Sequence, residues 1–163
     1  PTQRPTSPKT HLEVIDARET APEKSSKHMF DHHSLASVQG GLAVATPGEL
    51  RGLELLHRRH GSLPWKDVVD PALRLAQDGF AVSSRLADAI ALHWDKISQN
   101  PALAALLSKK KDGKVPLRTG DWLQRPVLAQ TLGRVAREGA AALHAGGTAR
   151  TLAQEIREAG GIV

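Results

Sequence analysis

The chain has 163 residues, 40% of them hydrophobic, and a formal net charge of +5 with an isoelectric point near 9.9. This length suits one domain with its own core, and the absence of cysteine excludes disulfides and thiolate chemistry. The 22 basic residues are interleaved with 17 acidic ones, and the one dense run, Lys109–Lys111, is typical of a solvated loop. We therefore expect no nucleic-acid partner. No apolar stretch reaches the ~20 residues of a membrane span.

The first segments are a linker and a strand. Residues 1–10 hold three prolines and read as a linker or frayed end. The apolar residues of His11–Ile15 predict a strand, and Asp16–Pro22 follows it with Arg18 near the strand end. An arginine can bind a carboxylate through two parallel hydrogen bonds, so residues 11–22 form a strand with a candidate anion-binding arginine.

The next part of the chain changes from loop to strand to helix. Residues 23–37 are polar and predict a surface loop. The glycine pair Gly40-Gly41 would let two backbones approach closely before a strand within residues 38–45. Residues 46–163 predict a helical lobe, so the chain is expected to be mostly helical with one or two strands near its start.

The first helix of this lobe begins with Thr46 as N-cap and Pro47 as first helical residue. Its four leucines, at positions 50, 53, 55 and 56, predict one buried stripe. A second helix starts at Asp70-Pro71, with Leu73, Leu75 and Ala76 facing inward. Further helices are expected over about 84–98, 102–107, 126–138 and 148–159, with glycine stops at 61, 79, 139 and 160.

Four segments resemble a known family. The run Asp16–Pro22 resembles the substrate-binding arginine motif of the γ-glutamyltranspeptidases, also called glutathione hydrolases. Gly40–Glu49 and Arg59–Trp65 are similar to two further stretches of that family, and Ala159–Val163 looks like its "AGGIV" helix ending. The resemblance runs in order from about residue 11 to residue 163.

The resemblance implies an α/β fold of the N-terminal-nucleophile hydrolase type, with αββα layers in the parent protein. Such enzymes cut themselves into a large and a small subunit and thereby expose a nucleophilic threonine. That threonine lies downstream of the part matched here. We therefore expect residues 11–163 to be an interior piece of the large subunit that is inactive alone.

The resemblance also implies the reaction and its setting. The parent would hydrolyse glutathione and γ-glutamyl amides, or transfer the γ-glutamyl group, as an acyltransferase through a γ-glutamyl-enzyme ester. Its partner would be the small subunit of the same precursor, and no cofactor is implied. The family suggests an extracellular, periplasmic or outward-facing membrane-anchored location, with any anchor in an N-terminal segment outside this chain.

Arg18 is the candidate binding residue, for the α-carboxylate of the γ-glutamyl substrate, because the matching family arginine does this. The alternative interpretation is that Arg18 forms a structural ion pair with Asp16 or Glu19. Glu19 and Pro22 would shape the turn. No catalytic residue is expected in the fragment. The histidines lack the further ligands that a metal site requires, so no metal is expected either.

Three alternatives remain open at this point. A non-catalytic or truncated family member could serve as a binding or scaffold domain. A basic helical nucleic-acid binder would lose affinity steeply with salt. Cephalosporin acylases have a similar architecture, although the arginine motif favours glutamyl substrates.

Overall fold

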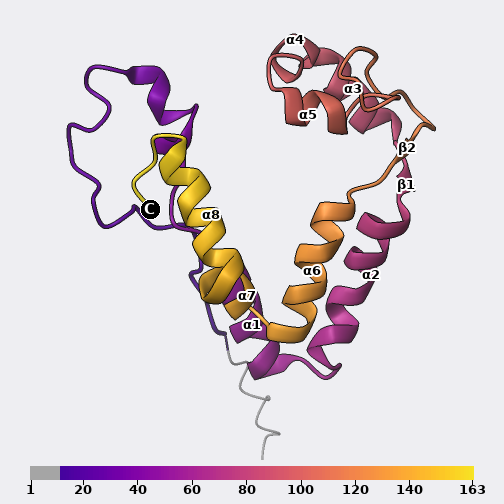
Figure 1. The fold of residues 1–163 in the computed structure, drawn as a ribbon. Coiled ribbons are helices and arrows are strands. Elements are labelled where there is room, and N and C mark those ends of the chain that lie inside the picture. The colour runs from indigo at the N-terminus through magenta and orange to yellow at the C-terminus, as the bar shows by residue number, and fades with distance from the viewer. Residues whose placement is uncertain (1–11) are drawn as a thin grey trace, which may run out of the picture. The chain divides into compact units, whose positions relative to one another are not determined.

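The computed structural model describes residues 12–163, which form two compact units (Figure 1). One unit comprises residues 12–61 and 153–163, and the other comprises residues 62–152. The expected linker at residues 1–10 lies outside the described residues, as does His11. The elements in chain order are η1 (Ser34–Ser37), η2 (Gly41–Ala43), α1 (Glu49–His60), α2 (Trp65–Asp78), β1 (Phe80–Ala81), α3 (Ser84–Leu92), α4 (Trp94–Ile97), α5 (Pro101–Leu106), β2 (Trp122–Leu123), α6 (Pro126–Glu138), α7 (Ala141–His144) and α8 (Gly146–Glu158).

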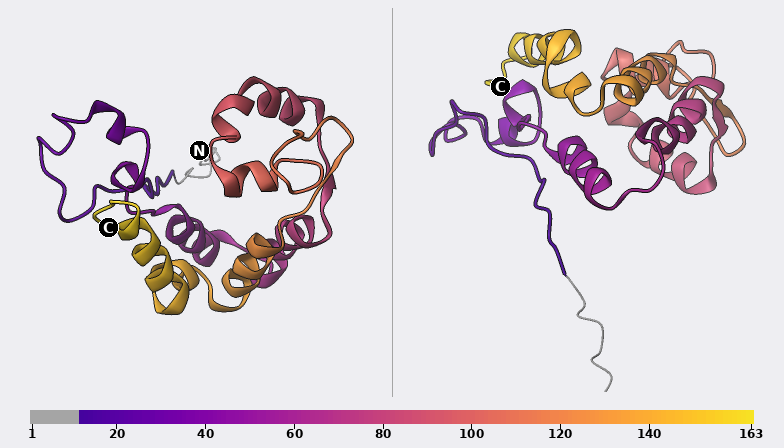
Figure 2. Two further views of the ribbon diagram at one scale, coloured as in Figure 1. Left: turned by 45° about the horizontal axis from the view of Figure 1, so that its top comes forward. Right: turned by 90° about the horizontal axis from the view of Figure 1, so that it is seen from below.

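The unit of residues 62–152 is built around a helix pair and a small helical cluster. Helices α2 and α6 pack side by side, as Figure 1 and both views of Figure 2 show. Strands β1 and β2 pair antiparallel, with Phe80 opposite Leu123. An apolar core lies between β2, α3, α4 and the neighbouring turns. Its buried members are Val82, Ala87, Ile90, Ile97, Leu117 and Leu123.

Several helices match the sequence prediction because their start and stop residues act locally. The side chain of Ser83 accepts a hydrogen bond from the Leu86 N–H and caps α3. Asn100 caps α5 in the same way, with Pro101 in the first turn. Helix α6 has the predicted bounds and ends at Gly139, whose φ of 67° is easily adopted only by glycine.

The predicted start of the first helix is wrong. Helix α1 begins at Glu49 with Gly48 at the N-cap, and not at Thr46 and Pro47. The reason is that the N–H and C=O of Thr46 are both hydrogen-bonded to Thr20, at 2.9 and 3.0 Å. Thr46 therefore belongs to an isolated antiparallel bridge and not to a helix cap.

The predicted buried stripe of α1 is also wrong in part. Leu53 and Leu56 are 49% and 46% exposed, and the buried residue of this helix is Gly52. Leu50 and Leu55 are half-buried. The segment around Ala17 lies against Gly52, so the close backbone contact and not the leucine row sets the covered face.

The second helix begins at Trp65, five residues before the predicted start at Asp70, and contains Pro71. The indole Nε1 of Trp65 donates to the backbone carbonyl of Val135 in α6, at 2.9 Å, and so fixes this first turn against α6. Proline removes one backbone donor within a helix, and the helix continues despite that loss. Ala76 faces inward as predicted, Leu73 is half-buried, and Leu75 is 56% exposed.

Three other expectations differ from the structure. The helix predicted over 84–98 is interrupted at His93, which separates α3 from α4. Residues 12–15 form no strand, and the strand predicted within 38–45 is replaced by the short 3-10 helices η1 and η2. The two strands of the described residues, β1 and β2, occur later in the chain and were not predicted.

Candidate functional site

Arg18 presents an exposed guanidinium. Its side chain is 83% exposed, and two of its five N–H donors are used by Glu19. The Nε group donates to Oε2 of Glu19 at 3.1 Å, and Nη2 donates to Oε1 at 2.9 Å. This pairing is bidentate and fixes the plane of the guanidinium. The Nη1 group has no hydrogen-bond partner among residues 12–163, so the Nη1–Nη2 edge can receive a second carboxylate.

The contact between Arg18 and Glu19 favours the charged form of both side chains. The hydrogen bonds from Arg18 lower the pKa of Glu19 to about 2, with smaller contributions from its own backbone N–H and from the positive charge. The same contact with Glu19 raises the pKa of Arg18. The Arg18 N–H also donates to Oδ1 of Asp16 at 3.2 Å. Asp16 and Glu19, the two partners that a structural ion pair would use, both contact Arg18, but only Glu19 contacts its guanidinium.

The segment that carries Arg18 is attached at both of its ends. After Arg18, the two backbone hydrogen bonds between Thr20 and Thr46 hold the chain beside the start of α1. Before Arg18, the carboxylate of Glu13 pairs with Arg59 and accepts from Nε2 of His60 at 2.9 Å, at the end of α1. The segment thus runs along α1, and its two attachments limit where Arg18 can lie.

Two of the glycine motifs pack against each other. The N–H of Gly41 donates to the carbonyl of Ala159 at 3.0 Å, at the C-terminal end of α8. A Cβ built on Gly41 would lie 2.6 Å from the backbone nitrogen of Gly161, so only glycine permits this approach. The predicted close approach at Gly40-Gly41 is confirmed, and its partner is the "AGGIV" segment. Figures 1 and 2 show the C-terminal end of α8 beside the segment that precedes α1.

Two of the histidines have carboxylate partners. His60 contacts Glu13, and Nδ1 of His28 lies 2.7 Å from Oδ2 of Asp31. Within residues 12–163, no three His, Cys, Asp or Glu side chains come together in a way that could hold a metal ion. Pro22 is buried, as suits a residue that shapes the turn after Glu19.

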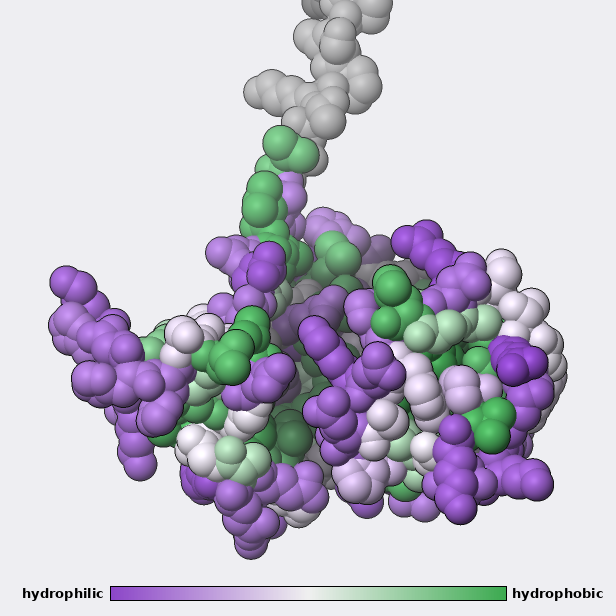
Figure 3. Space-filling view, turned by 90° about the horizontal axis from the view of Figure 1, so that it is seen from above, coloured by the Kyte–Doolittle hydropathy of each residue, from purple (hydrophilic) through white to green (hydrophobic). Residues whose placement is uncertain are grey.

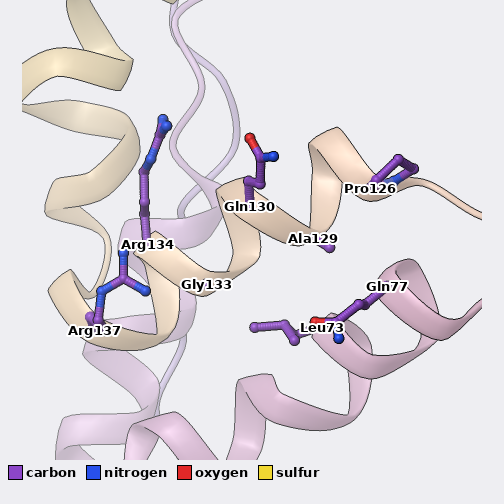
Figure 4. A pocket seen from close by; sticks show the side chains of 8 residues that line it. All are labelled: Leu73, Gln77, Pro126, Ala129, Gln130, Gly133, Arg134 and Arg137. Atoms are coloured by element: carbon purple, nitrogen blue, oxygen red, sulfur yellow. The ribbon is translucent and has the colours of Figure 1, made fainter.

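A separate surface cavity of about 620 Å³ lies along α2 and α6 (Figure 4). Its walls combine an apolar side chain, Leu73, with the amides of two glutamines and with two arginines of α6. Arg134 donates to the hydroxyl of Thr148 at 2.7 Å. The lining residues include no nucleophile and no acid, so this cavity offers no group for bond cleavage. The lining residues are Leu73, Gln77, Pro126, Ala129, Gln130, Gly133, Arg134 and Arg137.

Large apolar side chains are exposed in both units. Leu12 and Val38 of one unit are 86% and 72% exposed, and Leu92 and Val127 of the other unit are 78% and 75% exposed. Figure 3 shows hydrophobic patches among hydrophilic side chains on one face. None of the helices described here combines the length and the apolar character needed to cross a bilayer.

Sequence reasoning found Arg18 but missed the residues that hold it. Glu13 lies within a segment predicted as a strand, and Arg59 and His60 are 46 and 47 positions away along the chain. No local pattern connects such positions. The two glycines of α1, Gly48 and Gly52, were the available clue, because glycine inside a predicted helix indicates a close backbone contact.

Comparison with known proteins places the chain in one family. The γ-glutamyltranspeptidase family model matches residues 5–163. The chain is 41% identical over 151 residues to scoloptoxin SSD14 of Scolopendra dehaani, covering 93% of this chain and 26% of that protein. It is 40% identical over 159 residues to the glutathione hydrolase proenzyme of Arthroderma benhamiae, covering 95% and 26%. The chain thus spans about a quarter of the length of these curated relatives.

The fold agrees with this relationship. The solved γ-glutamyltranspeptidase of Helicobacter pylori superposes with a TM-score of 0.83 at 29% identity, over 91% of this chain and 43% of that chain. This match confirms the fold class that the resemblance implied, with a mostly helical fragment of an α/β protein. The family match extends over nearly all of the sequence, including the Arg18 motif, the glycine motifs and the helices between them. The chain belongs to the γ-glutamyltranspeptidase family.

Proposed function

We propose that the whole protein is a glutathione hydrolase or γ-glutamyltransferase, and that Arg18 binds the α-carboxylate of its γ-glutamyl substrate. The family match and the glutathione hydrolase relatives support the reaction class. The observation that carries the role of Arg18 is its exposed guanidinium, which Glu19 orients while leaving the Nη1–Nη2 edge available.

The proposed role requires no chemistry from this chain beyond binding and orientation. A carboxylate on the free edge of Arg18 would receive two parallel, charge-assisted hydrogen bonds. Fixing the α-carboxylate at one end of the γ-glutamyl group would place the γ-carbonyl at a set distance for nucleophilic attack. Glu19 would act by holding the guanidinium plane, since its two oxygens occupy the adjacent Nε–Nη2 edge.

The nucleophile in this proposal is a threonine outside residues 1–163, on the small subunit of a self-cleaved precursor. Its hydroxyl would form a γ-glutamyl ester, which water or an acceptor amine would resolve. The exposed apolar side chains of both units are compatible with contacts to other parts of such a protein. The isolated 163-residue chain is proposed to be inactive, and glutathione hydrolysis by the purified chain would overturn that part.

The experiment measures γ-glutamyl-p-nitroanilide hydrolysis by the whole protein and its Arg18→Ala variant. We expect KM to rise about 100-fold with a smaller change in kcat, because two charge-assisted hydrogen bonds to the substrate are lost. Arg74→Ala is the matched control, since Arg74 is also an exposed, carboxylate-paired arginine, bound to Asp70 in α2. Unchanged KM in Arg18→Ala would overturn the clamp. An inactive wild-type protein would favour the binding or scaffold alternative.

A further inference from the structure

Two glycines of α1 lie directly under the segment that carries Arg18. Gly48 is the N-cap of α1, and Gly52, one turn later, is its buried residue. A Cβ built on Gly52 would overlap the Cβ of Ala17, the residue before Arg18. A Cβ built on Gly48 would lie 2.8 Å from the carbonyl oxygens of Ala17 and Arg18. The segment therefore rests on the helix backbone itself, closer than any side chain allows.

Helix formation does not explain a glycine at position 52. Glycine is among the poorest residues for a helix interior, and Gly52 lies inside α1, where alanine would favour the helix. The contact with Ala17 does explain it. The nearest atoms to the missing side chain are the Cβ of Ala17, its Cα at 3.6 Å and Cγ2 of Ile15 at 3.8 Å.

We infer that Gly52 is a positioning residue for substrate binding, which acts through Ala17 to set the place of the Arg18 guanidinium. The inference rests on the proposed function. A side chain at position 52 must push Ala17 away from α1, and Arg18 is bonded directly to Ala17. The Thr20–Thr46 bridge holds the chain only three residues further on, so the displacement is concentrated at Arg18 and Glu19. A shift of about 1 Å in a group that positions the substrate can cost on the order of 100-fold in kcat/KM.

The first arm of the experiment compares two glycine-to-alanine changes in the whole protein. Gly52→Ala is expected to raise KM for γ-glutamyl-p-nitroanilide at least about tenfold, with kcat changed less than about threefold. Gly133→Ala is the matched control. It also lies inside a helix, α6, but its Cβ would meet only Arg137 Nη1 at 3.5 Å and Leu73 Cδ1 at 3.6 Å, which are ordinary contacts (Figure 4). Equal effects of the two changes would overturn the inference.

The second arm moves the methyl group across the contact. The double variant Ala17→Gly, Gly52→Ala removes the Cβ that the new side chain would strike, and it keeps the number of side-chain atoms the same. We expect its KM to return to within about threefold of the wild type, because the overlap is between the two Cβ atoms. A KM that stays as high as in Gly52→Ala alone would overturn the inference.

A third variant covers the case in which Gly52→Ala yields no folded protein. Ala17→Val enlarges the same contact from the other side and leaves α1 unchanged, so it is expected to raise KM in the same way. An unchanged KM would overturn the inference. Arg18→Ala in the same assay separates the two claims. If Arg18→Ala raises KM and both enlarging variants do not, the positioning role fails alone; if Arg18→Ala has no effect, the proposed clamp fails.

Discussion

The two units differ in what determines their structure. In residues 62–152, capped helices and a buried apolar cluster define the fold, with Val82 and Ile90 each 2% exposed. In the unit that contains Arg18, contacts between segments far apart in the chain do so. Thr20 pairs with Thr46, Glu13 with Arg59 and His60, and Gly41 with Ala159. The candidate binding residue thus lies in a segment without regular secondary structure, so changes in the contacts of that segment are expected to shift Arg18.

The largest expected effect concerns stability in the helical unit. Ile90→Ala should lower the free energy of unfolding of this unit by about 2–5 kcal/mol, because it leaves a cavity in the apolar core. Leu92→Ala in the same helix is the control, since Leu92 is 78% exposed. Denaturant unfolding of the whole protein measures both changes.

Stability and substrate binding are expected to change independently in the two units. The folded fraction of the Ile90→Ala variant should keep the KM of the wild type, because Ile90 belongs to the unit that does not carry Arg18. A KM raised as much as in Arg18→Ala would contradict the division of roles between the units.

A smaller effect is expected from Glu19→Gln. The amide of glutamine can accept from Arg18 through one oxygen only, so the guanidinium keeps its charge and loses its fixed plane. We expect KM for γ-glutamyl-p-nitroanilide to rise about fivefold, between wild type and Arg18→Ala. Steady-state kinetics of the three proteins give the order. A variant with the KM of the wild type would show that Glu19 does not orient Arg18.

The smallest effect is expected from pH. The pKa of Glu19 falls from 4.5 to about 2 in the folded protein, so the stabilising contribution of the ion pair is complete above pH 4.5 and is lost as pH falls through about 2. Between about pH 5 and pH 8 the pair should cause no break in the KM profile. A break in that range that is present in the wild type and absent in Glu19→Gln would contradict this assignment.

The local parts of the fold could be predicted from the sequence. Helix α6 and the caps Ser83 and Asn100 follow from residues adjacent to the element they define. The start of α1 could not be predicted this way. Thr46 is a residue type that often caps helices, but its backbone is hydrogen-bonded to Thr20. The early strands were wrong for a related reason. Their apolar residues follow a strand pattern, but no neighbouring strand pairs with them among residues 12–163.

Within the candidate site, the sequence indicated Arg18 but not the contacts that position it. The family motif indicated Arg18, while the bidentate contact with Glu19 and the glycine surface of α1 came from the structure. Close backbone contacts depend on the absence of a side chain, and an absence gives no periodic pattern. Gly52 thus interrupts the leucine row of α1 without indicating which segment covers it.

The most direct test of the account removes the proposed partner of Arg18 from the substrate. γ-Aminobutyryl-p-nitroanilide differs from γ-glutamyl-p-nitroanilide only by lacking the α-carboxylate. Measuring kcat/KM for both substrates with wild type and Arg18→Ala gives a thermodynamic cycle in which one change is in the protein and the other is in the substrate. We predict that Arg18→Ala lowers kcat/KM about 100-fold for the γ-glutamyl substrate and less than about threefold for the γ-aminobutyryl substrate. Equal losses for the two substrates would contradict the claim that Arg18 binds the α-carboxylate.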